Sequence, residues 1–188
     1  DEEIAQAKSL QQARQKLRHE AQQKATDPAI TVDGHQVEIV ANIGGVAGAQ
    51  DAMKSGAEGV GLLRTEFLFL ERISPPTEEE QFAVYRDIAK TMEGLPIIVR
   101  TLDVGGDKPL PYIKMPEEAN PFLGVRGIRL CMAKPEVLRE QVKAVLRATE
   151  YGKLRIMFPM VSDLSEWHEA RALVEEVRAE LGTDPVEM

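Results

Sequence analysis

The spacing of apolar residues changes about 30 residues into the chain. Residues 1–25 contain no Gly or Pro, and their apolar positions recur at roughly helical intervals. These apolar positions are Ile4, Leu10, Leu17 and Ala21. The pattern predicts one long helix that ends at Thr26-Asp27-Pro28, because a residue before proline disfavours the helical conformation. The apolar stripe is narrow, so the helix would pack on another surface or link two domains.

Short apolar runs then alternate with longer amphipathic stretches. Asp33-Gly34 between two apolar runs is typical of a hairpin turn. Beyond it, strands are predicted at 37–42, 59–63, 96–101 and 154–159. Helices are predicted at 46–55, 77–93, 134–150 and 163–181. Strand and helix thus alternate four times, and Thr77-Glu78-Glu79-Glu80 has the form of a capping box.

This alternation indicates an α/β protein with a parallel sheet. The strands are nearly continuously apolar, as expected where both faces of a sheet are covered. An open doubly wound sheet and part of a (β/α)8 TIM barrel, with about four βα units, both fit. Residues 184–188 resemble the start of a fifth strand. A whole barrel needs about 250 residues, so the barrel requires the chain of 188 residues to be a fragment; its start at Asp1 suggests the same.

Composition and charge narrow the possible partners. The chain has 31 acidic and 23 basic side chains, a formal net charge of -8, and no basic run. This disfavours nucleic acid and anionic membrane surfaces as partners. The single cysteine, Cys131, cannot form an internal disulfide, and no apolar run approaches the ~20 residues of a membrane span. We therefore expect a cytoplasmic protein without a membrane span.

Two predicted strands end in the same dipeptide. Arg64-Thr65-Glu66 follows the second strand, and Arg100-Thr101-Leu102-Asp103 follows the third. Ligands of α/β proteins bind at the carboxyl ends of the strands, and the planar guanidinium of arginine suits a carboxylate or a phosphate. Two such arginines suggest an anionic ligand. Alternatively, Arg64 and Arg100 neutralise Glu66 and Asp103, and the spacing does not decide between these readings.

The long connection after the third strand adds further candidates. Residues 120–129 mix polar and apolar side chains, which makes Arg126 a third candidate anion ligand and Arg129 a weaker one. Gly105-Gly106-Asp107-Lys108 could bring backbone amides to a phosphate, although it lacks the spacing of a Walker A loop. The glycines at 56–61 precede their strand and indicate a turn.

Other reactive side chains give no site. His19, His35 and His168 are scattered without a metal-ligand or catalytic spacing, so we expect them at the surface. Cys131 has an apolar helical context and no neighbouring histidine, which favours a core position. Asp103 with Asp107 is the single weak candidate for a magnesium site.

Four segments in order carry a resemblance to a known family. Residues 56–69, 99–108, 120–129 and 155–160 strongly resemble the phosphoenolpyruvate-binding domain of Enzyme I, the phosphoenolpyruvate-protein phosphotransferase of the bacterial sugar phosphotransferase system. The resemblance runs from about residue 30 to the end. Pyruvate phosphate dikinase and phosphoenolpyruvate synthase share the Leu-Arg-Thr-Glu motif of residues 63–66.

The resemblance implies an architecture and a substrate. Residues 1–27 would be a linker helix, and residues 28–188 the N-terminal half of a phosphoenolpyruvate-binding (β/α)8 barrel. Arg64 and Arg100 would contact the substrate, chiefly its phosphoryl group, with Arg126 nearby. Mg²⁺ would be the cofactor. The phosphoryl group would pass to a histidine on another domain and then to a histidine-containing phosphocarrier protein, and the whole enzyme would be a homodimer.

The resemblance also predicts what this chain lacks. The family's magnesium ligands, a further arginine and the catalytic cysteine lie on later strands, and the phosphorylated histidine lies before residue 1. Cys131 is not in the catalytic cysteine's motif. No catalytic residue or metal ligand is therefore expected here, and no turnover by the chain alone. Two alternatives remain: the Enzyme I module of a fructose-type multiphosphoryl transfer protein, and a non-catalytic dimerisation or docking module with exposed sheet edges.

Overall fold

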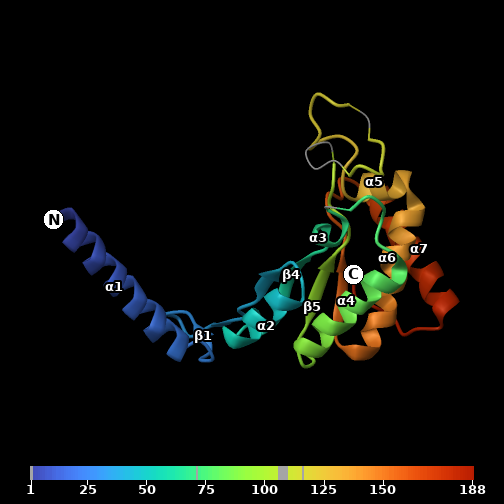
Figure 1. The fold of residues 1–188 in the computed structure, drawn as a ribbon. Coiled ribbons are helices and arrows are strands. Elements are labelled where there is room, and N and C mark those ends of the chain that lie inside the picture. The colour runs from blue at the N-terminus through green and yellow to red at the C-terminus, as the bar shows by residue number, and fades with distance from the viewer. Residues whose placement is uncertain (1, 71, 106–109, 116) are drawn as a thin grey trace.

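Four short strands form one parallel sheet whose order in space is their order in the sequence (Figure 1). The computed structural model describes residues 2–70, 72–105, 110–115 and 117–188. The sheet contains β3 (Ala41–Ile43), β4 (Val60–Arg64), β5 (Ile97–Arg100) and β6 (Leu154–Met157), each paired with the next. A doubly wound sheet reverses its order at a switch point, whereas a barrel does not. Of the two predicted architectures, the sheet is therefore that of a partial (β/α)8 barrel.

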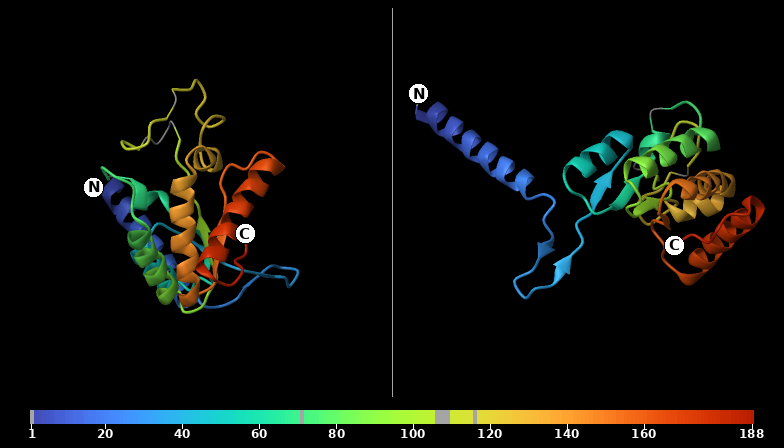
Figure 2. Two further views of the ribbon diagram at one scale, coloured as in Figure 1. Left: turned by 90° about the vertical axis from the view of Figure 1, so that its right-hand side faces the viewer. Right: turned by 90° about the horizontal axis from the view of Figure 1, so that it is seen from below.

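The longer helices of this α/β body lie side by side over one face of the sheet (Figure 2). They are α2 (Val46–Lys54), α4 (Glu78–Thr91), α6 (Pro135–Ala148) and α7 (Leu164–Leu181), all close to their predicted bounds. The capping box is confirmed: the Thr77 hydroxyl accepts from the Glu80 amide at 3.2 Å, and Glu80 accepts from the Thr77 amide at 2.8 Å.

The core lies between this helical layer and the sheet. Ile97 and Val99 of β5 are buried with helix residues such as Leu138, whereas the alternate residue Ile98 is half-buried. In β6 the same alternation leaves Arg155 exposed. The helices thus cover one face of the sheet as a single layer, and the residues of the other face are less buried among the described residues.

The N-terminal helix stands apart from this body (Figures 1 and 2). α1 spans Glu2–Gln23, as the residue pattern predicts, and residues 3–23 are all exposed. The predicted hairpin follows it: β1 (Ala29–Ile30) and β2 (Gln36–Val37) pair antiparallel, with Gly34 at a φ of 86° in the turn. The narrow apolar stripe of α1 is therefore exposed to solvent in this chain.

Three local features differ from the predicted elements. The first predicted strand is divided into β2 and β3, because Ile39 exchanges hydrogen bonds with Glu58: its amide donates to the carboxylate at 2.6 Å, and its carbonyl accepts from the Glu58 amide at 2.8 Å. The helices α3 (Glu66–Phe69) and α5 (Ile128–Ala133) are too short to show a period. A 3₁₀ turn at Thr149–Tyr151 ends α6.

The C-terminal residues touch the sheet. Glu187 forms a parallel bridge with Arg155, and its carbonyl accepts from the Ile156 amide at 2.8 Å. This single bridge lies where a fifth strand was predicted to start. Among the described residues, no helix combines the length and the apolar composition that a membrane crossing requires.

Candidate anion-binding site

Arg64 and Arg100 end neighbouring strands at the same level of the sheet. The two residues are Cα partners in the parallel pairing of β4 with β5. The repeated Arg-Thr dipeptide in the sequence is therefore a repeated position in space. Because parallel strands carry their carboxyl ends at one edge, both guanidinium groups originate at the edge where ligands of such folds bind.

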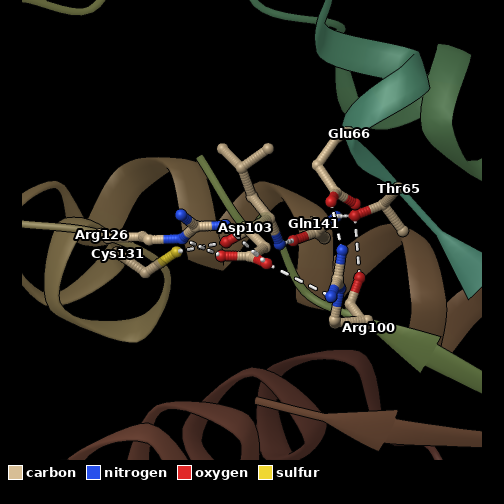
Figure 3. Close-up of polar contacts among 8 residues, drawn as sticks. Thr65, Glu66, Arg100, Asp103, Arg126, Cys131 and Gln141 are labelled. Carbon is tan, nitrogen blue, oxygen red and sulfur yellow. Dashed lines mark hydrogen bonds and ion pairs between the residues drawn. The ribbon is translucent and has the colours of Figure 1, made fainter. Parts of the chain in front are cut away.

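Arg100 is held by two buried carboxylates (Figure 3). Its guanidinium pairs with Glu66, which begins α3, and with Asp103 at an Nη1–Oδ2 distance of 3.2 Å. Side-chain exposure is 17% for Arg100, 5% for Glu66 and 7% for Asp103. The neutralisation that the sequence left open is thus present for Arg100. Arg64, by contrast, is exposed.

Arg126 joins the same cluster from the long connection. Its Nε donates to Asp103 Oδ1 at 2.9 Å, and its guanidinium carbon lies 4.6 Å from the centre of the Phe122 ring. Gly105 packs against its stem so closely that an added Cβ would lie 2.9 Å from the Arg126 Cβ. Asp103 therefore holds the two guanidinium groups of Arg100 and Arg126 together.

Arg129, the weaker candidate, has a different position. Its Nε donates to the Gly124 carbonyl at 2.7 Å and its Nη1 to the Met160 carbonyl at 3.1 Å. These contacts tie the long connection to the segment after β6. They give Arg129 a structural role, with its donors directed at backbone oxygens.

A buried glutamine, which the sequence did not single out, lies under the two strand ends. Gln141 of α6 is fully buried and accepts from the Leu102 amide at 2.8 Å. Its Nε2 donates to Thr65 Oγ1 and to the Tyr85 hydroxyl, each at 3.1 Å. Thr65 in turn donates to the Arg100 carbonyl at 2.8 Å. The helical period places Gln141 on the same face as Leu138, Val142 and Val145, and this apolar stripe is the signal that could have identified it.

The remaining candidates from the sequence are Cys131, the three histidines and the loop residues 106–108. Cys131 is in the core, as predicted; burial first, and the Asp103 charge second, raise the pKa of its thiol to about 12. His19, His35 and His168 are exposed, as predicted. Gly106, Asp107 and Lys108 lie outside the described residues.

A hollow opens beside Arg64, between the end of β3 and the start of α2. Asn42, Gly44, Gly45 and Phe67 contribute to its lining. An added Cβ at Gly44 would lie 2.6 Å from the Phe67 ring, so this wall is closely packed. The exposed guanidinium of Arg64 therefore borders a space in which a small ligand could lie.

The described residues do not fit a magnesium ion. They contain no group of three His, Cys, Asp or Glu side chains arranged to hold a metal. The two carboxylates beside the arginines, Glu66 and Asp103, are ion-paired to guanidinium groups, which compete with a cation for their oxygens.

The parallel sheet and the arginine cluster at its carboxyl edge define an α/β domain with a candidate anion-binding site, and the chain belongs to the family described as PEP-utilising enzyme, PEP-binding domain, which matches residues 18–188. Among its relatives, the multiphosphoryl transfer protein of Rhodobacter capsulatus is 56% identical over 161 residues, which are 86% of this chain and 20% of that protein. The phosphoenolpyruvate-protein phosphotransferase of Staphylococcus carnosus (strain TM300) is 48% identical over 188 residues, all of this chain and 33% of that protein. The phosphoenolpyruvate-protein phosphotransferase of Bacillus subtilis (strain 168) is 49% identical over 155 residues, which are 82% of this chain and 27% of that protein. The chain thus spans a third or less of the length of these relatives.

Proposed function

We propose that this chain supplies part of the phosphoenolpyruvate site of a phosphoenolpyruvate-protein phosphotransferase. In that reaction the phosphoryl group passes to an enzyme histidine and on to a histidine-containing phosphocarrier protein. The observation that carries the proposal is the register of Arg64 with Arg100 at two adjacent strand ends. Family membership and the names of the relatives support the same substrate.

The arrangement suits a small, highly charged anion. Arg64 offers an exposed guanidinium, while Glu66 and Asp103 fix the plane of the Arg100 guanidinium before any ligand arrives. Arg100 Nε is buried and has no hydrogen-bond partner among the described residues. Donors that are already oriented stabilise the charge of a transferring phosphoryl group without a reorganisation cost. We assign phosphoryl contact to Arg64 and Arg100, with Arg126 beside them.

Further parts of the reaction belong to the proposal through the family resemblance. Mg²⁺, its two carboxylate ligands, a further arginine, the proton-donating cysteine and the phosphorylated histidine would all come from outside this chain. The whole enzyme would be a cytoplasmic homodimer. The chain alone, incubated with labelled phosphoenolpyruvate, should neither become phosphorylated nor release pyruvate, and either event would contradict this division of roles.

The test is arginine replacement in the full-length phosphotransferase that carries this segment. Arg64→Ala and Arg100→Ala should raise the KM for phosphoenolpyruvate about tenfold or more and lower turnover, since a hydrogen bond to a charged group is worth roughly 1.5–3 kcal/mol. Arg139→Ala is the matched control, because Arg139 pairs with Glu176 and Glu180 on the helical surface. Unchanged KM and turnover in both site variants would refute the assigned roles.

A multiphosphoryl transfer protein is a second candidate for the whole protein. The relative from Rhodobacter capsulatus carries that name and is 56% identical over 161 residues. Both candidates would use the same phosphoenolpyruvate site. The reading frame adjoining this segment decides between them, because a fused carrier or sugar-specific domain would be encoded there.

A further inference from the structure

We propose that Gln141 is a positioning residue for the phosphoenolpyruvate-binding arginines, an inference that rests on the proposed function. Gln141 lies on α6, and its side chain does not reach the guanidinium groups themselves. It bonds instead to groups at the ends of β4 and β5, from which Arg64 and Arg100 extend. Figure 3 shows Gln141 between Thr65 and Asp103.

The hydrogen-bond directions around Gln141 are unambiguous. The Leu102 amide can only donate, so the group facing it must be the side-chain oxygen. The nitrogen then has two protons, one for Thr65 Oγ1 and one for the Tyr85 hydroxyl. Burial raises the pKa of Tyr85, so its phenol remains protonated. One side chain thus uses both of its donor protons and its acceptor oxygen on three separate elements.

Two of these bonds control the arginine pair. Thr65 separates Arg64 from Glu66, and its hydroxyl, oriented by Gln141, donates to the Arg100 carbonyl at 2.8 Å. Gln141 itself accepts from the Leu102 amide, two residues beyond Arg100. Besides the backbone pairing of β4 with β5, this amide therefore holds the two strand ends in their relative position, and a shift there moves both Arg64 and Arg100.

The other end of the same hydrogen-bond chain provides a matched control. Tyr85 donates to Gln81 Oε1 at 3.2 Å, and Gln81 Nε2 donates to the Pro76 carbonyl at 3.2 Å. Gln81 is also buried, at 1% exposure, and lies on α4. Replacing it removes the same kind of buried amide from the core but leaves the contacts to Thr65 and Leu102 in place.

The experiment compares Gln141→Met with Gln81→Met in the full-length phosphotransferase that carries this segment. Both variants should lower the melting temperature, because each removes buried hydrogen bonds. Gln141→Met should raise the KM for phosphoenolpyruvate about tenfold and lower kcat, while Gln81→Met should keep KM within about twofold of the wild-type value. Equal effects of the two variants on KM, or no effect of Gln141→Met, would overturn the positioning role.

Thr65 supplies a second, independent readout. Thr65→Val removes the hydroxyl at constant shape and should raise KM as Gln141→Met does, whereas Thr65→Ser keeps the hydroxyl and should restore most of the affinity. Failure of serine to improve on valine would contradict the mechanism. The arginine variants separate the two hypotheses: if Arg100→Ala impairs the enzyme while Gln141→Met does not, only the positioning role is wrong, and if neither Arg64→Ala nor Arg100→Ala has an effect, the proposed function itself fails.

Discussion

Arg100 and Asp103 form a buried pair in which the carboxylate also holds a second cation. Asp103 Oδ2 lies 3.2 Å from Arg100 Nη1, and Asp103 Oδ1 lies 2.9 Å from Arg126 Nε. One carboxylate thus orients two guanidinium groups, one from β5 and one from the long connection, where Arg126 lies 23 residues beyond Asp103. The site depends on this residue although we assign it no contact with the ligand.

Asp103→Asn should destabilise the fold strongly. The change leaves two guanidinium groups, exposed to only 17% and 7%, with a weaker common partner. Breaking a buried ion pair from one side costs about 3–5 kcal/mol. Urea unfolding would measure the change in the free energy of unfolding. The control is Asp87→Asn, whose partner Arg86 lies at the surface, and it should cost less than about 1 kcal/mol. Similar losses for both variants would contradict the central role of Asp103.

Gly105→Ala should weaken substrate binding through Arg126. A Cβ at this position would lie 2.9 Å from the Arg126 Cβ, so the arginine stem must move away from Asp103. We expect the KM for phosphoenolpyruvate to rise about threefold to tenfold, as for a modest misplacement of a binding group. A double-mutant cycle tests whether Gly105 acts through Arg126. Gly105→Ala should raise KM little further in the Arg126→Ala background, and fully additive effects on KM would show that Gly105 acts elsewhere.

Gly127→Ala should destabilise the segment before α5. Gly127 has a φ of 55°, and an added Cβ would lie 3.0 Å from the Pro159 carbonyl oxygen. Strain of this backbone type costs about 1–3 kcal/mol, and the contact adds to it. Gly94→Ala has a comparable φ of 85° but open space around the new Cβ, so it should cost less. Thermal unfolding of the two variants provides the comparison. An equal loss of stability in both would show that the close contact with Pro159 does not contribute.

Cys131 should make stability fall at high pH. Its thiol pKa is about 12 in the folded chain and 9.0 ordinarily, so above pH 9 the unfolded state loses a proton that the folded state keeps. The free energy of unfolding should therefore decrease between pH 9 and pH 12, with a slope approaching about 1.4 kcal/mol per pH unit. Cys131→Ala removes this contribution, and identical pH profiles for the two proteins would contradict it.

The sequence predicted the arginine pair more fully than the groups around it. The positions of Arg64 and Arg100 followed from two apolar runs with the same ending, because parallel strands align their ends. The sequence left open whether Glu66 and Asp103 form ion pairs with these arginines, since spacing along the chain does not determine side-chain direction. Gln141 was missed because a glutamine is usually at the surface, although the helical period places it on the buried face of α6 beside Leu138, Val142 and Val145.

The fold elements show a similar limit. The longer helices followed from periodicity and capping residues, whereas the division between β2 and β3 results from contacts between Ile39 and Glu58, which lie on different segments. The helix α5 follows Gly127 and is six residues long, which is less than two turns. Local patterns predict long elements, and contacts distant in sequence determine where the short ones begin and end.

The sequential order of the sheet has a consequence for synthesis. Since β3, β4, β5 and β6 are neighbours in space in the order in which they are translated, each new strand meets a partner that has already been made. Pairing of β5 with β4 brings Arg64 and Arg100 together, and at that stage α6, with Gln141, has not yet been translated. The emerging chain can therefore form its arginine pair before it contains the side chain that fixes it.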